Sequence, residues 1–275
     1  MARKTVVTII RHGETDYNKA GIVQGHLDVP LNAEGLAQAS VTGRWFAQQR
    51  VRFEEGWSSD LARARKTAEL ILEQQREKGV QLRLDERIRE RHLGNLQGKR
   101  RGEPGTDRST VEPIHTLRAR LWSFWDSLFP PTGPSDSSAP SSLSSSVSSL
   151  APPAPPSTSS RSLSSSTSSL LPQGRQILYV SHGAAIREFV SSLVEYADRG
   201  ERDIELVLPK QEAEMIRKGS KRIDNCSRTV IEMEWVEDEE GSGHWHGRLV
   251  LYADDTHFID SSRAPSPTEN ADVVE

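Results

Sequence analysis

The chain has little of several features that would place it in particular classes of protein. Its 275 residues include one cysteine, and the formal net charge is −4 at pH 7. One cysteine excludes an internal disulfide and suits a reducing compartment. No continuous basic stripe is present, so nucleic acid is not an expected partner. No run is apolar and long enough to span a bilayer, so we expect no membrane contact either.

The chain also lacks a recognisable targeting segment. It begins Met-Ala-Arg-Lys and enters an apolar strand at once, which leaves no room for a cleavable signal. We therefore expect a cytoplasmic protein. The single cysteine, Cys226, precedes a predicted strand, where a small buried apolar residue is a better interpretation than a reactive thiol.

One long segment is almost without large apolar side chains. Residues 130–171 consist mainly of Ser, Pro, Ala and Thr, and such a composition cannot offset the entropy cost of ordering. We therefore predict a disordered insert, which a fold tolerates because loop-closure cost grows slowly with length. The prediction is one domain over residues 1–260, interrupted by this insert and followed by a disordered tail over residues 261–275.

What the chain does have is one arrangement used twice. Residues 5–10 form a β-branched apolar run that predicts a buried strand, and Arg11-His12-Gly13 ends it. Residues 176–180 form a second such run, followed by Ser-His-Gly at residues 181–183 and a helical pattern. If the two strands are parallel neighbours, His12 and His182 meet at the carboxyl edge of the sheet, where α/β proteins bind ligands.

The rest of the pattern alternates strands and helices, which predicts an α/β protein with a mostly parallel sheet. Arg63 falls in the first turn of a predicted helix, where an anion would be welcome. Glu90 lies in a charged loop over residues 85–102. The other predicted strands cover residues 53–57, 81–84, 227–236 and 247–253, and the predicted helices cover residues 32–50, 61–78, 113–128 and 212–218. Asn32 and Asp60 are the expected N-caps of the first two of these helices.

These residue types fit phosphoryl transfer. Arg11 and Arg63 can hold phosphate oxygens through two hydrogen bonds each, and Gly183 lets backbone N–H groups approach an anion. A neutral imidazole can attack phosphorus, and the spacing alone does not decide whether His12 or His182 does so. A protonated second histidine would neutralise developing charge.

Glu90 is the candidate proton donor and acceptor. As a general acid it must carry its proton near neutral pH, which burial or a bound phosphate would favour. In the second half-reaction the same carboxylate would deprotonate water. Taken alone, each of these residues has a structural explanation, and their joint placement at strand ends and a helix start favours catalysis.

Four segments together resemble the histidine phosphatase superfamily, which includes cofactor-dependent phosphoglycerate mutases and many phosphatases. They are Arg-His-Gly-Glu-Thr at 11–15, Ser-Asp-Leu-Ala-Arg-Ala at 59–64, Glu-Arg-His-Leu-Gly at 90–94 and Ser-His-Gly at 181–183. The resemblance implies a three-layer α/β/α sandwich and a phosphohistidine on His12. It also implies that the phosphate is held by Asn18, Gln24, Gly25, Gly183 and Ala184.

We therefore predict a phosphomonoesterase that needs no metal or cofactor and acts on a small phosphorylated metabolite such as a sugar (bis)phosphate. Residues 24–32 and 89–99 look like the phosphatase branch of the superfamily. The step at Asn225-Cys226-Ser227 before a strand is similar to the TIGAR-type fructose-2,6-bisphosphatases.

Two alternatives stay open at this stage. The first is a phosphoglycerate mutase, although Leu93 stands where mutases carry a tyrosine. The second is a weakly catalytic scaffold whose Ser/Pro insert binds protein partners. Two histidine-containing clusters also resemble metal sites, but a surface hairpin and a solvated strand end explain them better; they are His244 with His246, and Asp254 and Asp255 with His257.

Overall fold

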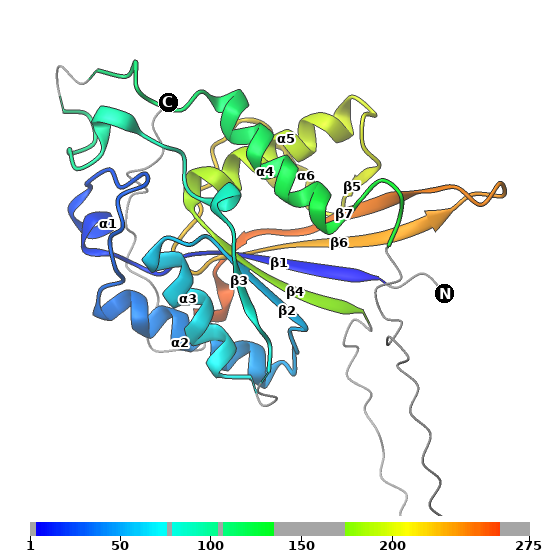
Figure 1. Ribbon diagram of the computed structural model, residues 1–275, viewed down its shortest axis with the longest axis horizontal. Helices are drawn as coiled ribbons and strands as arrows, with labels where there is room; N and C mark the ends of the chain where they lie inside the picture. Colours follow the sequence, from blue (N-terminus) through cyan, green and yellow to red (C-terminus); the bar gives the residue numbers. More distant parts are fainter. Residues whose placement is uncertain (1–3, 76–78, 104–106, 135–173, 259–275) are drawn as a thin grey trace, which may run out of the picture.

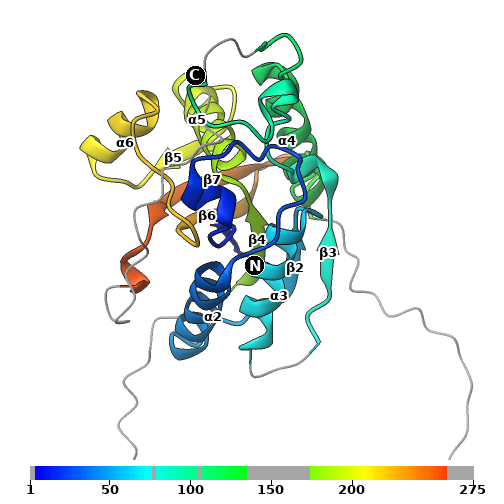
Figure 2. The same cartoon turned by 90° about the vertical axis from the view of Figure 1, so that its left-hand side faces the viewer.

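The computed structural model describes residues 4–75, 79–103, 107–134 and 174–258, in three layers with a central sheet (Figures 1 and 2). The strands are β1 (Thr5–Arg11), β2 (Glu55–Ser58), β3 (Leu82–Leu84), β4 (Arg175–Ser181), β5 (Ile204–Leu206), β6 (Arg228–Glu237) and β7 (Gly243–Asp254). The α-helices are α1 (Asp16–Ala20), α2 (Ala33–Gln48), α3 (Ala62–Glu73), α4 (Ile114–Leu128), α5 (Gly183–Asp198) and α6 (Lys210–Arg217).

The sheet has the strand order β3-β2-β4-β1-β6-β7-β5. Strand β4 lies between β1 and β2 and is parallel to both, whereas β6 is antiparallel to β1 and to β7. Strand β2 also pairs with β3 in parallel, as does β5 with β7, so the predicted α/β class with a mostly parallel sheet is confirmed. The β6–β7 hairpin projects beyond the sheet at the end opposite α1 (Figure 1).

Strand β1 is buried along its whole length because helices cover both faces of the sheet. Side chains alternate along a strand, so Val7 and Ile9 face one helical layer and Ile10 faces the other. The first layer contains α4 and α5, and the second contains α2 and α3 (Figure 1). The larger core cluster includes Trp122, Phe124, Trp125 and Phe189 from α4 and α5. The aromatic side chains of α4 thus belong to the core.

Helix α2 begins at a local capping residue, whereas the start of α3 is capped by a residue from a distant loop. Asn32 caps α2 as the sequence predicts, its side chain accepting from the Gly35 amide at 2.8 Å. The expected cap of α3 by Asp60 is wrong, because Asp60 bonds instead to the Arg89 guanidinium. The first amide of α3, that of Ala62, donates to the carboxylate of Asp28 from a remote loop.

Two elements are missed by the sequence patterns. Helix α1 has five residues and strand β5 has three, too short for a hydrophobic period to show. The predicted insert lies outside the described residues from 135 onward, and so does the predicted tail. Within the part of the chain that is described, no helix has the length and apolarity that crossing a membrane requires.

The prediction that Cys226 is a buried residue at a strand start is confirmed, and it gives a test of the fold. The thiol is fully buried, and burial raises its pKa to about 12. We expect a thiol-reactive dye to label the native protein very slowly and to label one thiol per chain in denaturant. Rapid full labelling of native protein would contradict this placement of the loop before β6.

Candidate active site

The two strand-ending histidines lie side by side. Strands β1 and β4 pair in parallel with Arg11 opposite Ser181, so His12 and His182 leave the sheet at the same level. The His12 amide donates to the Ser181 carbonyl at 2.9 Å, which extends the ladder one residue further. The imidazole centroids are 5.1 Å apart, and both side chains are fully buried.

The hydrogen bonding of His12 fixes its tautomer. Its Nδ1 lies 2.7 Å from the Gly13 carbonyl oxygen, which only accepts, so Nδ1 carries the proton. The lone pair is therefore on Nε2. Among the described residues, none hydrogen-bonds to Nε2 of His12 or to either ring nitrogen of His182. Buried polar atoms without partners are rare in native proteins, and here they belong to two neighbouring rings.

Both histidines are neutral at pH 7. Burial and then the positive charge of Arg63 lower the pKa of each imidazole well below 6.5. Arg11 adds to this effect on His12. A neutral His12 has the nucleophilic lone pair that the sequence analysis requires. His182 is neutral as well, so it becomes a cation only when a bound anion offsets burial and Arg63.

Two buried guanidiniums flank the histidines. Arg11 ends β1 and donates from Nη1 to the Ile223 carbonyl at 2.8 Å. Arg63, in the first turn of α3, donates to the carbonyls of Gly25 and Leu27 at 2.7 and 2.8 Å. These carbonyls orient two guanidiniums beside the histidines, and guanidinium N–H groups in this place suit an anion.

Gly13 is needed for close packing rather than for an unusual turn. A Cβ atom at Gly13 would lie 2.5 Å from the Gly35 carbonyl oxygen in α2. The Gly13 amide donates to the Thr67 hydroxyl of α3 at 3.0 Å. The turn after His12 is therefore packed between α2 and α3, which holds the imidazole in place.

Asn18 and Gln24 are brought together by Thr15. Thr15 caps α1 in a reciprocal capping box with Asn18, and its hydroxyl donates to the Gln24 side chain at 2.9 Å. Both Asn18 and Gln24 are buried. Gln24 precedes Gly25, whose carbonyl holds Arg63. The structure thus joins these predicted substrate-binding residues to Arg63, and it adds Thr15 as the link between them.

The Glu90 side chain is fully buried, and its carboxylate contacts the first turn of α5. Its carboxylate accepts from the amides of Ala184 and Ala185 at 3.1 and 2.9 Å and from the Arg91 amide at 2.9 Å. Gly183, the first residue of α5, follows His182 directly. The Ala184 amide, which the sequence analysis assigns to the phosphate, donates to Glu90 here. The carboxylate and His182 therefore share the positive end of one helix.

One residue supports the site without having been assigned to it. The Asn225 side chain donates to the His12 carbonyl at 2.8 Å, and the Cys226 amide donates to the Arg11 carbonyl at 3.0 Å. Cys226 has a positive φ of 57°, which turns the chain back toward β1. The Asn-Cys-Ser step noted in the sequence thus holds the Arg-His turn from the far side.

The other histidine clusters have different partners. His244 and His246 of β7 both bond to the Asp203 carboxylate, at 3.1 and 2.8 Å. His257 is buried against the Thr42 hydroxyl and Trp45, so the expectation of a solvated strand end there is wrong. Within the described residues, no group of three or more His, Cys, Asp or Glu side chains is placed to hold a metal ion.

The fold and its chemistry define a class of protein, an α/β enzyme that hydrolyses or transfers phosphoryl groups. The chain belongs to the histidine phosphatase superfamily. The model of branch 1 of that superfamily matches residues 7–128. The fructose-2,6-bisphosphatase TIGAR of Xenopus tropicalis is 32% identical over 208 residues, which are 69% of this chain and 75% of that protein.

Two further matches involve phosphoglycerate mutases, one by sequence over part of the chain and one by structure at low identity. A 2,3-bisphosphoglycerate-dependent phosphoglycerate mutase of Streptococcus gordonii is 32% identical over 126 residues, 46% of this chain and 52% of that protein. The crystal structure of a phosphoglycerate mutase from Bacillus anthracis has a TM-score of 0.59 and 17% identity, and the match covers 95% of this chain and 98% of that one. The structural likeness shows the fold alone.

The low pKa values of the buried histidines predict a loss of stability in weak acid. His12, His182 and His257 stay neutral when folded, whereas in the unfolded chain they bind protons below about pH 6.5. Their contribution is complete above that pH. Each of these rings costs stability as the pH falls below that value, so urea unfolding should give a lower free energy at pH 5.5 than at pH 7.5.

A substitution separates this effect from general acid denaturation. Burial lowers the pKa of His257 to about 3, so His257→Gln should reduce the difference between the two pH values by about 1.4 kcal/mol. His115, an exposed residue of α4, provides the matched control, and His115→Gln should leave the difference unchanged. Equal stability at pH 5.5 and 7.5 would contradict the neutral, buried state of these rings.

Proposed function

We propose that this protein is a phosphomonoesterase that works through a phosphohistidine on His12. The observation that carries the proposal is the state of His12: a buried, neutral ring with its proton on Nδ1 and its Nε2 lone pair beside His182 and two guanidiniums. The phosphohistidine route is general to the superfamily to which the chain belongs. The roles of the individual residues are part of the proposal.

In the first half-reaction, Nε2 of His12 forms a bond to phosphorus as the bond from phosphorus to the ester oxygen breaks. Arg11 and Arg63 hold the non-bridging oxygens, assisted by Asn18, Gln24 and the amide of Gly25. His182 takes up a proton as the dianion binds and donates to an equatorial oxygen. These contacts favour the transition state more than the substrate because charge moves onto those oxygens.

Glu90 transfers the proton in both half-reactions. It protonates the departing alcohol, which leaves Glu90 as the carboxylate. It then takes a proton from the attacking water as the water oxygen bonds to phosphorus and the bond to Nε2 breaks. Phosphate leaves, and Glu90 is protonated again for the next cycle, so protons balance and no metal ion enters a step.

The substrate we propose is a small phosphorylated metabolite, such as a sugar (bis)phosphate. The sequence match to a fructose-2,6-bisphosphatase, 32% identical over 69% of this chain, supports a sugar phosphate. The side chains of the candidate site are buried, which suits a small molecule better than a protein surface. Protein partners of the Ser/Pro insert would act outside this chemistry.

A second candidate function is phosphoglycerate mutase, which the match to the Streptococcus enzyme favours. A mutase returns the phosphoryl group to a second hydroxyl, so water must be kept from the phosphohistidine. Leu93 is fully buried and packs with Val23 and Leu96. It offers no hydroxyl at the position where mutases carry tyrosine. Supplying 3-phosphoglycerate with a bisphosphate primer separates the two functions, because only a mutase forms 2-phosphoglycerate.

The direct test is a panel of phosphate esters with wild type and His12→Ala. Wild type should release phosphate and form an acid-labile, base-stable phosphoenzyme with radiolabelled substrate. His12→Ala should do neither and should lose at least about 10³-fold in kcat/KM, because no other group replaces the nucleophile. Turnover retained in His12→Ala would overturn the proposal.

The two roles of Glu90 predict a specific defect in Glu90→Gln. An aryl phosphate such as p-nitrophenyl phosphate has a leaving group that needs little protonation, so His12 should still be phosphorylated by it. Hydrolysis of the phosphoenzyme should be slow, because the amide cannot take a proton from water. Rapid-quench kinetics should therefore show a burst of one nitrophenol per chain. A uniform loss for aryl and alkyl phosphates without a burst would assign the proton transfer to another residue.

A further inference from the structure

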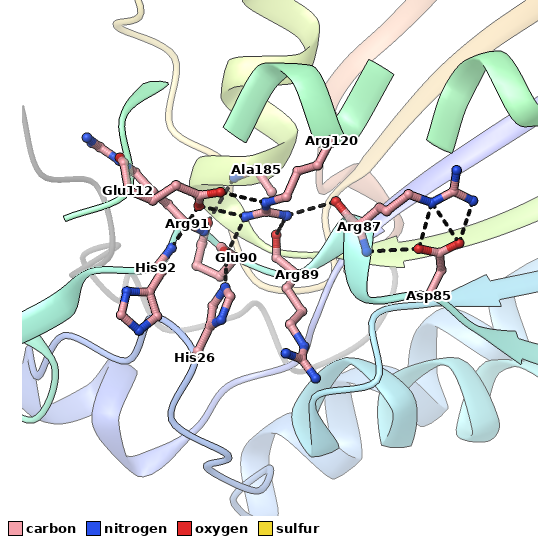
Figure 3. A network of polar contacts seen from close by, with 10 residues as sticks. All are labelled: His26, Asp85, Arg87, Arg89, Glu90, Arg91, His92, Glu112, Arg120 and Ala185. Atoms are coloured by element: carbon pink, nitrogen blue, oxygen red, sulfur yellow. Dashed lines mark hydrogen bonds and ion pairs between the residues drawn. The ribbon is translucent and has the colours of Figure 1, made fainter. Parts of the chain in front are cut away.

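One arginine of α4 holds the main chain that carries Glu90. Arg120 of α4 directs its guanidinium at the carbonyl groups of the 87–90 loop (Figure 3). Its Nη1 donates to the carbonyls of Arg87 and Arg89 at 2.8 and 2.7 Å, and its Nη2 donates to the Glu90 carbonyl at 2.7 Å. Three carbonyls within four residues thus share one cation.

Glu112 fixes the arginine itself. Its carboxylate accepts from Nε and Nη2 of Arg120 at 2.8 and 2.9 Å, which accounts for the remaining two of the five guanidinium N–H groups. The same carboxylate accepts from the His92 amide at 3.0 Å. Burial opposes the ionisation of Glu112, but these hydrogen bonds outweigh it and lower its pKa. Every donor of Arg120 is therefore committed, and none points to a substrate.

The Glu90 carbonyl has a second donor from the other side of the site. His26 lies 2.7 Å from that oxygen through Nε2, which must carry the proton because a carbonyl only accepts. Burial lowers the pKa of His26 to about 4, so the ring is neutral. His26 follows Gln24 and Gly25, the loop assigned to the phosphate. The carbonyl oxygen of Glu90 thus accepts from Arg120 of α4 and from His26 of the loop assigned to the phosphate.

This arrangement bears on catalysis because the Glu90 side chain has little freedom of its own. The carboxylate is fixed by the amides of Ala184, Ala185 and Arg91, so a displacement of the main chain would pull it off those donors. A proton-transfer group displaced by about 1 Å loses on the order of 10²-fold in rate. We propose that Arg120, held by Glu112, is a positioning residue that sets the place of Glu90 for proton transfer.

The inference rests on the proposed role of Glu90. It predicts an effect on alkyl phosphates that a purely structural role of Arg120 would not produce. Arg120→Lys keeps the charge but offers three donors without the planar fork, so at least two of the five hydrogen bonds are lost. We expect kcat/KM to fall about 30-fold for an alkyl phosphate, whose departure needs a proton. For p-nitrophenyl phosphate we expect a fall of less than about 3-fold, with KM little changed for either.

A matched control comes from the same helix. Arg118 is two residues away and bonds to Glu188 and Glu195 of α5, not to the 87–90 loop. Arg118→Lys should therefore leave the alkyl-to-aryl ratio of kcat/KM unchanged. Thermal unfolding of both variants shows whether each is folded at the assay temperature. If Arg120→Lys does not fold, Glu112→Gln replaces it, with a smaller loss in the same direction.

A double substitution completes the experiment. In a Glu90→Gln background residue 90 no longer transfers a proton, so its position no longer affects this step. Arg120→Lys should then have no further effect on the alkyl-to-aryl ratio of kcat/KM. Equal losses for both esters, a full effect in the Glu90→Gln background, or the same change in Arg118→Lys would overturn the positioning role. If Glu90→Gln alone leaves the ratio unchanged, the proposed role of Glu90 fails instead.

Discussion

The parallel pairing of β1 with β4 is the constraint on which the rest of the structure depends. Two segments 170 residues apart each end a buried strand with His-Gly, and the ladder brings them into register up to Arg11 and Ser181. The His12 amide then bonds to Ser181, which fixes where both rings emerge. A slip of one residue would turn one histidine to the other face of the sheet.

The electrostatics of the site follow from that placement. Burying two imidazoles next to two guanidiniums lowers the pKa of both rings, which keeps His12 in the neutral form that the proposed nucleophile requires. Arg11 and Arg63 are buried beside these rings, and the carbonyls of Ile223 and Gly25 orient their guanidiniums. In the proposed reaction a bound phosphate would meet these cations and favour a proton on His182. The two guanidiniums are thus in place before an anion binds, and an anion would be attracted to them.

Local patterns in the sequence account for the elements and for much of the candidate site. The β-branched run before Arg11, the cap at Asn32 and the helix that places Arg63 are each encoded within a few residues, so they are predictable. Asp60 shows the limit of such signals. As a good capping residue before a helix it predicts a local bond, yet a salt bridge to Arg89 from another loop takes its side chain.

The residues that position the catalytic groups have no local signal. Asn225 is 213 positions from His12 and Arg120 is 30 from Glu90, so only the folded chain brings each pair together. From the sequence alone, Arg120 looks like an ordinary charged residue of an amphipathic helix. Its hydrogen bonds to the carbonyls of the 87–90 loop are visible only in the structure. The Asn-Cys-Ser step could have pointed to Asn225, since it precedes the strand that pairs with β1.

The most direct measurement of the central claim is a crystal structure of the protein with vanadate. We expect vanadium bonded to Nε2 of His12, with Arg11, Arg63 and His182 on the equatorial oxygens and Glu90 near the axial oxygen opposite His12. Vanadate bonded to His182, or bound away from both rings, would contradict the account.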